Sequence, residues 1–177
     1  MALRHTRLYA LSIALVIPGV VTAQRAVHIG AAATAATPVG EFSNAYATGL
    51  GGLVTLAYGN DNFPIGLRID VANARAQGRA VAGVKSDAIN LTSVSANLIG
   101  TAAVASLKPY LIGGAGWYPY RETEDAKRKS HLGINGGVGV TVPFPMLGAL
   151  FLESRYHRIY GRTATKRYVS TSLGIVL

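Results

Sequence analysis

The sequence contains no cysteine among its 177 residues. Small exported domains are often held together by disulfides, and this chain, which begins with a candidate export signal, can form none. Its stability must therefore come from packing, from lipid, or from a sheet that closes on itself so that its hydrogen-bonded ladder has no open edge.

Long apolar runs are also missing from most of the chain. Beyond residue 23, glycine, threonine, serine or asparagine recurs within every apolar segment. None of these segments approaches the ~20 apolar residues that a membrane-spanning helix needs. Helical membrane spanning is therefore excluded for this part of the sequence.

The one long apolar run lies at the N-terminus. It starts at Leu8, directly after a short basic stretch, and ends in the small-residue site Val21-Thr22-Ala23. This order is typical of a cleaved secretory signal peptide, which we predict for residues 1–23, with a single domain at 24–177. An uncleaved membrane anchor is the alternative, but the run is shorter than a spanning helix and is broken near its end.

Acidic residues are scarce, with 8 against 17 basic ones. Setting aside the two arginines of the predicted signal peptide leaves 15 basic residues against the same 8 acidic ones. An exported protein with this balance is suited to polyanions, whether nucleic acid, anionic lipid headgroups or acidic polysaccharide.

What the chain does contain is a period-two alternation of apolar and polar residues, which predicts strands. The eight candidate strands are 26–36, 46–58, 64–75, 88–101, 109–118, 131–142, 149–160 and 166–177. Most have about the 9 to 11 residues that a tilted strand needs to cross a bilayer. The sequence therefore predicts an all-β fold, an eight-stranded antiparallel up-and-down transmembrane β-barrel, with a soluble lipocalin-like barrel as the competing fold.

The connections between these strands alternate between short and long. Three of them are tight, rich in turn formers and almost uncharged: 59–63, 105–108 and 143–148. The longer ones, with their flanks, hold most of the charged residues: 37–45, 77–87, 119–130 and 161–165. An outer-membrane barrel has short periplasmic turns and longer outside loops, so we expect both termini on the periplasmic side.

The last segment, Tyr168 to Leu177, has an apolar face on its odd positions, ending on Leu177. A membrane barrel needs a closing strand of this kind, whose outward face meets lipid. We expect it to pair with the first strand, with Val27, Ile29 and Ala31 facing outward.

Several motifs resemble the small eight-stranded outer-membrane β-barrel proteins, the group that includes opacity-type adhesins and the membrane domain of outer membrane protein A. They are Gly66-Leu67-Arg68-Ile69-Asp70, Pro109 to Gly116, Gly133 to Gly139, Glu153-Ser154-Arg155-Tyr156 and Ser172 to Leu177. The resemblance covers nearly all of the chain after the signal peptide. It implies a barrel in the bacterial outer membrane and leaves the activity open, since such folds host many functions.

Four charged residues fall at mid-strand, where only an inward direction avoids lipid, because a cation facing the bilayer midplane costs roughly 2 to 4 kcal/mol. Arg68 and Asp70 lie on the third strand, Glu153 and Arg155 on the seventh. These two strands lie on opposite sides of an eight-strand ring, whose lumen is narrow enough for side chains to fill. We predict that Arg68 pairs with Glu153 and Asp70 with Arg155, plugging the lumen. A proton path or a gated pore is the alternative role.

No catalytic, cofactor or metal site is predicted. Glu153, Ser154 and His157 are neighbours in sequence, but by parity Ser154 faces away from the other two, so they do not form a triad. His131 and His157 could both face the lumen, and two histidines without a third ligand are weak support for a metal site. The glycine clusters lie inside strands, where glycine relieves crowding beside large side chains.

Basic residues of the longer connections are the remaining functional candidates, as contacts for anionic lipid or glycan. They are Arg79, Lys85, Arg121, Lys127, Arg128, Lys129, Arg162, Lys166 and Arg167. The predicted role is structural or a surface interaction, either adhesion or lipopolysaccharide contact, with a small porin or a lipid A-modifying enzyme as alternatives. Expected partners are outer-membrane lipid, lipopolysaccharide, the barrel assembly machinery and a surface polyanion. Nucleic acid is not expected, because no aromatic stacking platform accompanies the charges.

Overall fold

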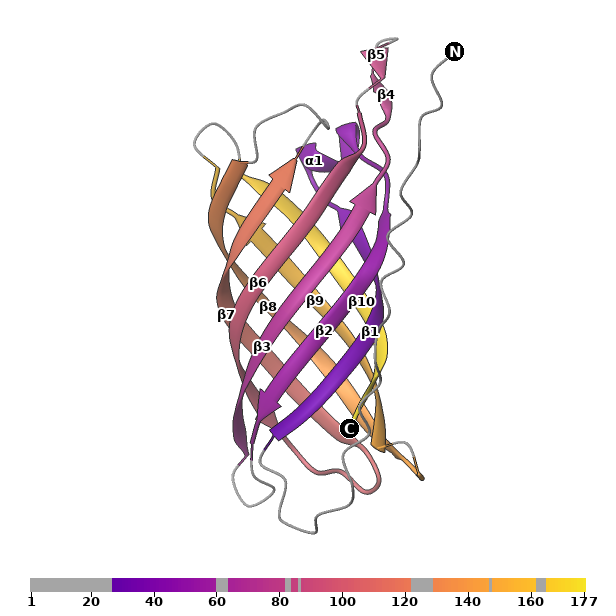
Figure 1. The fold of residues 1–177 in the computed structure, drawn as a ribbon, viewed down its shortest axis with the longest axis vertical. Helices are drawn as coiled ribbons and strands as arrows, with labels where there is room; N and C mark the ends of the chain where they lie inside the picture. Colours follow the sequence, from indigo (N-terminus) through magenta and orange to yellow (C-terminus); the bar gives the residue numbers. More distant parts are fainter. Residues whose placement is uncertain are drawn as a thin grey trace, which may run out of the picture.

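Eight strands, each antiparallel to both of its neighbours, close into a barrel (Figure 1). A computed structural model describes residues 27–59, 64–81, 84–85, 87–121, 129–146, 148–161 and 165–177. The predicted signal peptide, 1–23, lies outside the described residues.

The barrel strands agree closely with those expected from the alternation. They are β1 (Val27–Pro38), β2 (Gly49–Tyr58), β3 (Ile65–Ala76), β6 (Ile89–Thr101), β7 (Lys108–Arg121), β8 (Lys129–Phe144), β9 (Gly148–Ile159) and β10 (Lys166–Val176). Around the barrel they follow one another in the up-and-down order β1-β10-β9-β8-β7-β6-β3-β2. The predicted fold, an eight-stranded antiparallel up-and-down barrel, is confirmed.

The first and last strands form the seam that closes the sheet. Ala31 lies opposite Ile175 and Ala33 opposite Leu173. The ladder continues to the end of the chain, where the Leu177 amide donates to the carbonyl oxygen of Ile29 at 2.8 Å. Because every edge is paired, no strand of the barrel leaves a row of unpaired backbone groups.

The two ends of the barrel differ, as the connection lengths predicted. The start of β1 at Val27, the end of the chain, and the adjoining ends of β2 and β3, of β6 and β7, and of β8 and β9 lie at one end, which we call the turn end (Figure 1). The other, the loop end, carries a short helix α1 (Glu41–Ala45) and a hairpin of β4 (Ala80–Val81) and β5 (Val84–Lys85). Neither α1 nor the hairpin follows from the alternation. Within the described residues, no helix is long and apolar enough to cross a membrane.

The apolar face of each strand points out of the barrel. Leu67 and Ile69 on β3 are 57% and 53% exposed, and Leu132 on β8 is 72% exposed. The residues expected to face outward on the seam, Val27, Ile29 and Ala31, are exposed as well. The barrel is thus apolar outside, the reverse of a soluble barrel with a hydrophobic core.

The large aromatic residues near the strand ends divide between the two faces. Tyr58, Trp117, Tyr156 and Tyr160 point outward and are about half exposed. Tyr118 does not: it is 1% exposed and lies inside the barrel. Two adjacent aromatics must face opposite ways on a strand, so Trp117 and Tyr118 could not both belong to an outer aromatic band.

The interior near the loop end is an apolar cluster rather than a polar lumen. Its buried members are Ala36, Phe42, Ala74, Ala76, Ile89, Leu91, Tyr118, Ile159 and Tyr168, with Tyr46 packed against them. Phe42 comes from α1, whose N-cap Gly40 has a φ of +64°, a value that glycine adopts without steric cost. The helix therefore supplies an aromatic side chain to the loop end of the interior.

A disulfide can test the seam, because the natural chain has no cysteine to compete. With Ala33→Cys and Leu173→Cys together, we expect most molecules to cross-link on mild oxidation, since directly opposed strand residues have the Cα spacing that a disulfide needs. Non-reducing gel migration measures this. Ala31→Cys with Leu173→Cys, displaced by two residues along β1, should cross-link far less. Equal cross-linking of both pairs would contradict the register.

Candidate functional site

The four charged residues predicted for the lumen come from opposite walls of the barrel. β3 and β9 are four strands apart in either direction around the ring of eight. Arg68 and Asp70 are two residues apart on β3, and so are Glu153 and Arg155 on β9, so that each pair points to the same face of its strand. All four side chains are buried.

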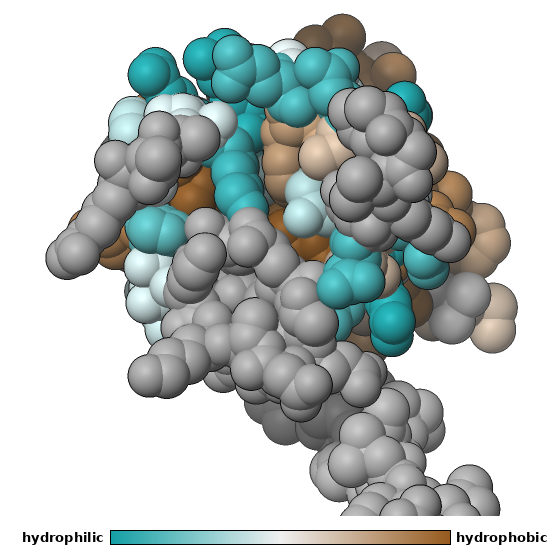
Figure 2. Space-filling view, turned by 90° about the horizontal axis from the view of Figure 1, so that it is seen from above, coloured by the Kyte–Doolittle hydropathy of each residue, from teal (hydrophilic) through white to brown (hydrophobic). Residues whose placement is uncertain are grey.

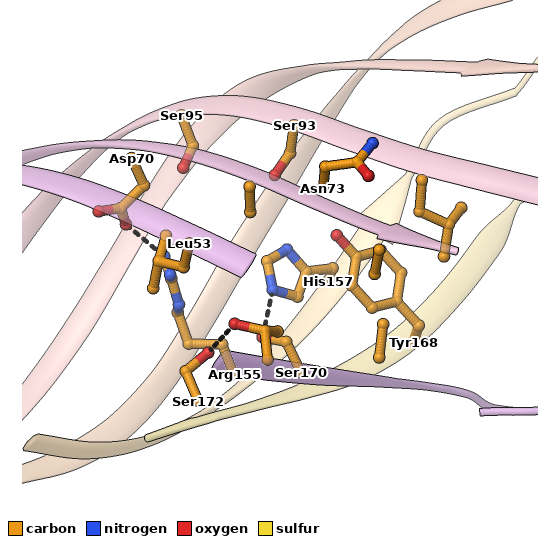
Figure 3. Close-up of a pocket in the computed structure, with 15 residues that line it drawn as sticks. Leu53, Asp70, Asn73, Ser93, Ser95, Arg155, His157, Tyr168, Ser170 and Ser172 are labelled. Carbon is orange, nitrogen blue, oxygen red and sulfur yellow. Dashed lines mark hydrogen bonds and ion pairs between the residues drawn. The ribbon is translucent and has the colours of Figure 1, made fainter. Parts of the chain in front are cut away.

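The structure brings both expected pairs together across the lumen. Arg68 Nη2 lies 2.7 Å from Glu153 Oε2. Arg155 Nη1 lies 2.7 Å from Asp70 Oδ2 (Figure 3). Neighbours on the same strand are paired as well, with Arg68 Nε 2.9 Å from Asp70 Oδ1 and Arg155 Nε 2.7 Å from Glu153 Oε1. Every charge in this lumen network thus has two partners of opposite sign.

Neutral side chains complete the network from the adjoining strands. The Tyr110 hydroxyl donates to Glu153 Oε2 at 2.9 Å, and Asn97 Nδ2 donates to Asp70 Oδ2 at 3.0 Å. Asn135 Nδ2 in turn donates to Asn97 Oδ1 at 2.9 Å. Burying an ion pair is unfavourable unless its remaining lone pairs and protons are also satisfied, and these three residues supply much of that compensation.

Inward-facing glycines on β8 leave room for the large lumen side chains of the adjacent strands. A Cβ at Gly139 would overlap the ring of Tyr110, and one at Gly137 would stand 2.6 Å from Cγ of Arg155. A Cβ at Gly133 would lie 2.9 Å from the ring of Tyr118. The glycine-rich sequence of β8 is therefore a packing requirement of the lumen, as expected for glycines within strands.

A buried histidine lies beside the lumen network, toward the loop end. His157 is stacked on Tyr168 with ring centroids 4.4 Å apart, and its Nε2 lies 2.9 Å from Ser170 Oγ (Figure 3). Its other ring nitrogen, Nδ1, lies 3.1 Å from the Tyr118 hydroxyl. A serine at this distance from a histidine has the spacing of a nucleophile and its base.

The surroundings of this serine argue for a structural role. The group at His157 Nδ1 is a hydroxyl, whereas a hydrolytic triad has a carboxylate there. Ser170 is buried, and the adjoining cavity of about 20 Å³ is the size of a single water molecule. Ser154, the serine considered from sequence, is exposed on the outside of β9. Ser170 was missed because it meets His157 only through the pairing of β9 with β10, where Tyr168 lies opposite His157.

The two candidate histidines of the lumen do not lie opposite each other on the paired strands β8 and β9. His157 lies opposite Asn135, while His131 lies opposite Tyr118 on β7. Across the part of the chain that the structure describes, no three His, Cys, Asp or Glu side chains are grouped so as to hold a metal ion.

The basic candidates within the described residues lie on elements at the loop end, where Figure 2 shows hydrophilic side chains around the rim with hydrophobic ones visible between them. Arg79 and Arg167 are exposed, and Lys166 Nζ lies 5.4 Å from the ring centroid of Phe42. Lys85, Arg121 and Lys129 are on strands β5, β7 and β8. Lys127, Arg128 and Arg162 lie outside the described residues.

Two arginines at the loop end belong to the outer wall. Arg158 on β9 and Arg167 on β10 are directly opposite each other, and both are exposed on the outward face. Arg158 lies 5.4 Å from the ring centroid of Tyr160. In the described residues, no carboxylate forms an ion pair with either arginine. The register between β9 and β10 is what places Arg158 beside Arg167.

Comparison with known proteins gives the fold. No protein-family model and no curated protein sequence matches the chain. Its structure is similar to that of Neisserial surface protein A, with a TM-score of 0.69 at 18% identity over 86% of this chain and 97% of the other. OprG of Pseudomonas aeruginosa has a TM-score of 0.57 at 14% identity, over 85% and 93% of the two chains. A major outer membrane protein from Thermus thermophilus has 0.54 at 12%, over 86% and 100%. The expected resemblance to small outer-membrane β-barrels is confirmed as a likeness of fold.

Removing one charge from the lumen network should destabilise the barrel. Glu153→Gln leaves both arginines short of a partner, and breaking a buried ion pair in this way typically costs about 3 to 5 kcal/mol. Urea unfolding in lipid vesicles, followed by the fluorescence of the single tryptophan, measures the loss. Arg68→Met with Glu153→Leu should cost less than Glu153→Gln, because a cation and an anion leave together.

Glu41→Gln is the matched control for the carboxylate substitution. Glu41 is exposed on α1, so its replacement should change the free energy of unfolding by less than about 0.5 kcal/mol. If Glu153→Gln and Glu41→Gln unfolded at the same urea concentration as the natural chain, the lumen network would not be a stabilising element.

Proposed function

We propose that the chain is a bacterial outer-membrane β-barrel with a closed lumen, which contacts phosphorylated lipid through basic residues at its loop end. The observation that carries the proposal is the Arg158 and Arg167 pair, opposed on the outward face of the wall without a carboxylate partner among the described residues. Export by the signal peptide at 1–23 and insertion by the barrel assembly machinery are part of the proposal.

The outward surface supports the membrane setting. A soluble protein rarely exposes a contiguous apolar patch of more than a few hundred Å², whereas here the outward residues of every barrel strand include exposed large apolar side chains. The strands have 10 to 16 residues, enough for a tilted strand to span the ~30 Å hydrocarbon core. OprG and the Thermus protein, which share this fold, are both outer-membrane proteins.

The arginine pair is suited to a phosphate. Like charges directly opposite each other on a sheet are destabilising, and an anion placed between them would remove that repulsion. Guanidinium groups also bind phosphate oxygens through two parallel hydrogen bonds. The phosphorylated glycolipid of an outer leaflet would present such groups at the height of the outer rim.

The other basic candidates extend this contact around the loop end. They are Arg79, Lys85, Arg121, Lys127, Arg128, Lys129, Arg162 and Lys166. In the proposed orientation the loop end faces outward, so the same residues would serve lipopolysaccharide contact and adhesion to a surface polyanion.

A porin or an enzyme finds less support. Two successive barriers cross the interior: the lumen network, and the apolar cluster that includes Phe42. A lipid A-modifying enzyme would need its catalytic groups at the lipid boundary, whereas Ser170 and His157 are buried inside the barrel. The role proposed for the four lumen charges is therefore to close the barrel.

Lipid contact can be tested with Arg158→Gln combined with Arg167→Gln. Each basic side chain near an anionic lipid surface contributes about 1 kcal/mol, so we expect the affinity for lipid A in detergent to fall roughly thirtyfold, measured as retained lipid by native mass spectrometry. Arg158→Lys with Arg167→Lys should retain most of the binding. Unchanged binding by the glutamine pair, or equal binding of dephosphorylated lipid A, would contradict the proposed contact.

Closure of the lumen can be tested by single-channel recording of the natural chain in planar bilayers. We expect no steady conductance of porin size, because both the paired charges and the apolar cluster lie across the path. A known porin reconstituted in the same bilayers shows that the assay can detect an open barrel. A steady porin-sized conductance from this chain would refute the closed lumen while leaving the lipid contact untouched.

A further inference from the structure

The interior toward the turn end is not filled. A cavity of about 710 Å³ lies between the lumen network and the turn end, and residues from that end line it. Arg68 and Tyr110 line its inner part, and His28, Lys108 and Leu177 come from the ends of β1, β7 and the chain. The volume is within the range of about 300 to 1,000 Å³ that is usual for small-molecule sites.

The wall of this turn-end cavity is mainly apolar. Ile99 on β6 and Phe151 on β9 face it from two sides, and Ala57 on β2 faces it from a third. Phe151 is 4% exposed, so this ring lies within the barrel and not in the outer wall. A hydrocarbon chain would exchange water for these surfaces, which is the main favourable term in binding an apolar group.

The charged side chains that line the cavity all belong to basic residues. These are Arg68 and Lys108, and no aspartate or glutamate is among the described residues that line it. Arg68 is already paired with two carboxylates behind the inner end of the cavity, so an anion entering that far would meet Asp70 and Glu153 as well.

We propose that the turn-end cavity binds a single-chain anionic amphiphile, such as a medium-chain carboxylate. The chain lies against Ile99, Phe151 and the ring of Tyr110. The head group remains at the turn end, where Lys108 is exposed and water can still solvate the charge. That this end faces the periplasm rests on the proposed function, whereas binding itself depends only on the cavity.

The test uses a decanoate that carries a diazirine on its chain, added to the full barrel in lipid nanodiscs, with mass spectrometry to locate the cross-links. Saturable labelling of Tyr110, Phe151 or Ile99, displaced by unlabelled decanoate, is the expected result. Labelling confined to outward residues would mean that the probe reaches the protein only from the lipid, and would overturn the proposal.

Two substitutions on β2 provide a matched pair. Ala57→Trp fills the cavity and should lower the interior labelling at least tenfold, whereas Leu56→Trp, next to it on the outward face, should leave it unchanged. Heat-modifiable gel migration verifies that both variants fold. Equal interior labelling of the two folded variants would also overturn the proposal.

The charge of the ligand is tested separately. A decyltrimethylammonium probe with the same diazirine should label the interior at least tenfold less than the decanoate, and Lys108→Gln should reduce that preference while Lys108→Arg keeps it. Equal labelling by the two probes would refute the anionic ligand. Loss of lipid A binding in the Arg158 and Arg167 variants has no effect on this readout, so the two proposals fail independently.

Discussion

Closure of the sheet at the seam between β1 and β10 is the constraint on which the rest of the structure depends. Once Ala33 lies opposite Leu173, no strand of the barrel has a free edge, and every residue of every strand must face either the lumen or the outside. In a soluble domain, a charged side chain that does not fit the core can lie at a sheet edge or under a loop. This barrel has two faces only, so a charge that cannot face lipid must find its partner inside.

The lumen network is the result of that restriction. Arg68 and Asp70 are far in sequence from Glu153 and Arg155, yet the ring leaves all four no other direction to point. Their burial would be unfavourable for any one of them alone. Two consequences follow for the neighbouring strands: Tyr110 and Asn97 must donate hydrogen bonds, and Gly137 and Gly139 must lack side chains. Charges on β3 and β9 thus constrain which residues fit on β6, β7 and β8.

Period two and ring geometry explain how much could be predicted from the sequence. An alternating strand fixes the faces of its residues without knowledge of its neighbours, so the outward positions of Leu67, Leu132 and Leu173 follow from parity. The pairs Arg68 with Glu153 and Asp70 with Arg155 needed one further step, that the third and seventh strands of eight are opposite. Both steps are independent of detailed packing.

The features that could not be predicted depend on register or on local loop structure. The helix α1 is only five residues long, which is too short to show a helical period. Its Phe42 is buried because it packs into the apolar cluster of the interior. Ser170 and His157 meet through the pairing of β9 with β10, and so do Arg158 and Arg167. A single sequence does not reveal by how many residues two strands are staggered. The alternation of faces therefore does not predict which residues lie opposite each other on neighbouring strands.

The interior changes along the barrel axis from an apolar cluster, through the lumen network, to an open cavity. On the loop-end side the charges are bounded by the apolar cluster, with a cavity the size of a single water molecule between the two. On the other side the lumen network ends in Arg68 and Tyr110. Arg68 pairs with Asp70 and Glu153, the Tyr110 hydroxyl donates to Glu153, and both residues also line the cavity. Arg68 and Tyr110 therefore belong both to the lumen network and to the lining of the cavity toward the turn end.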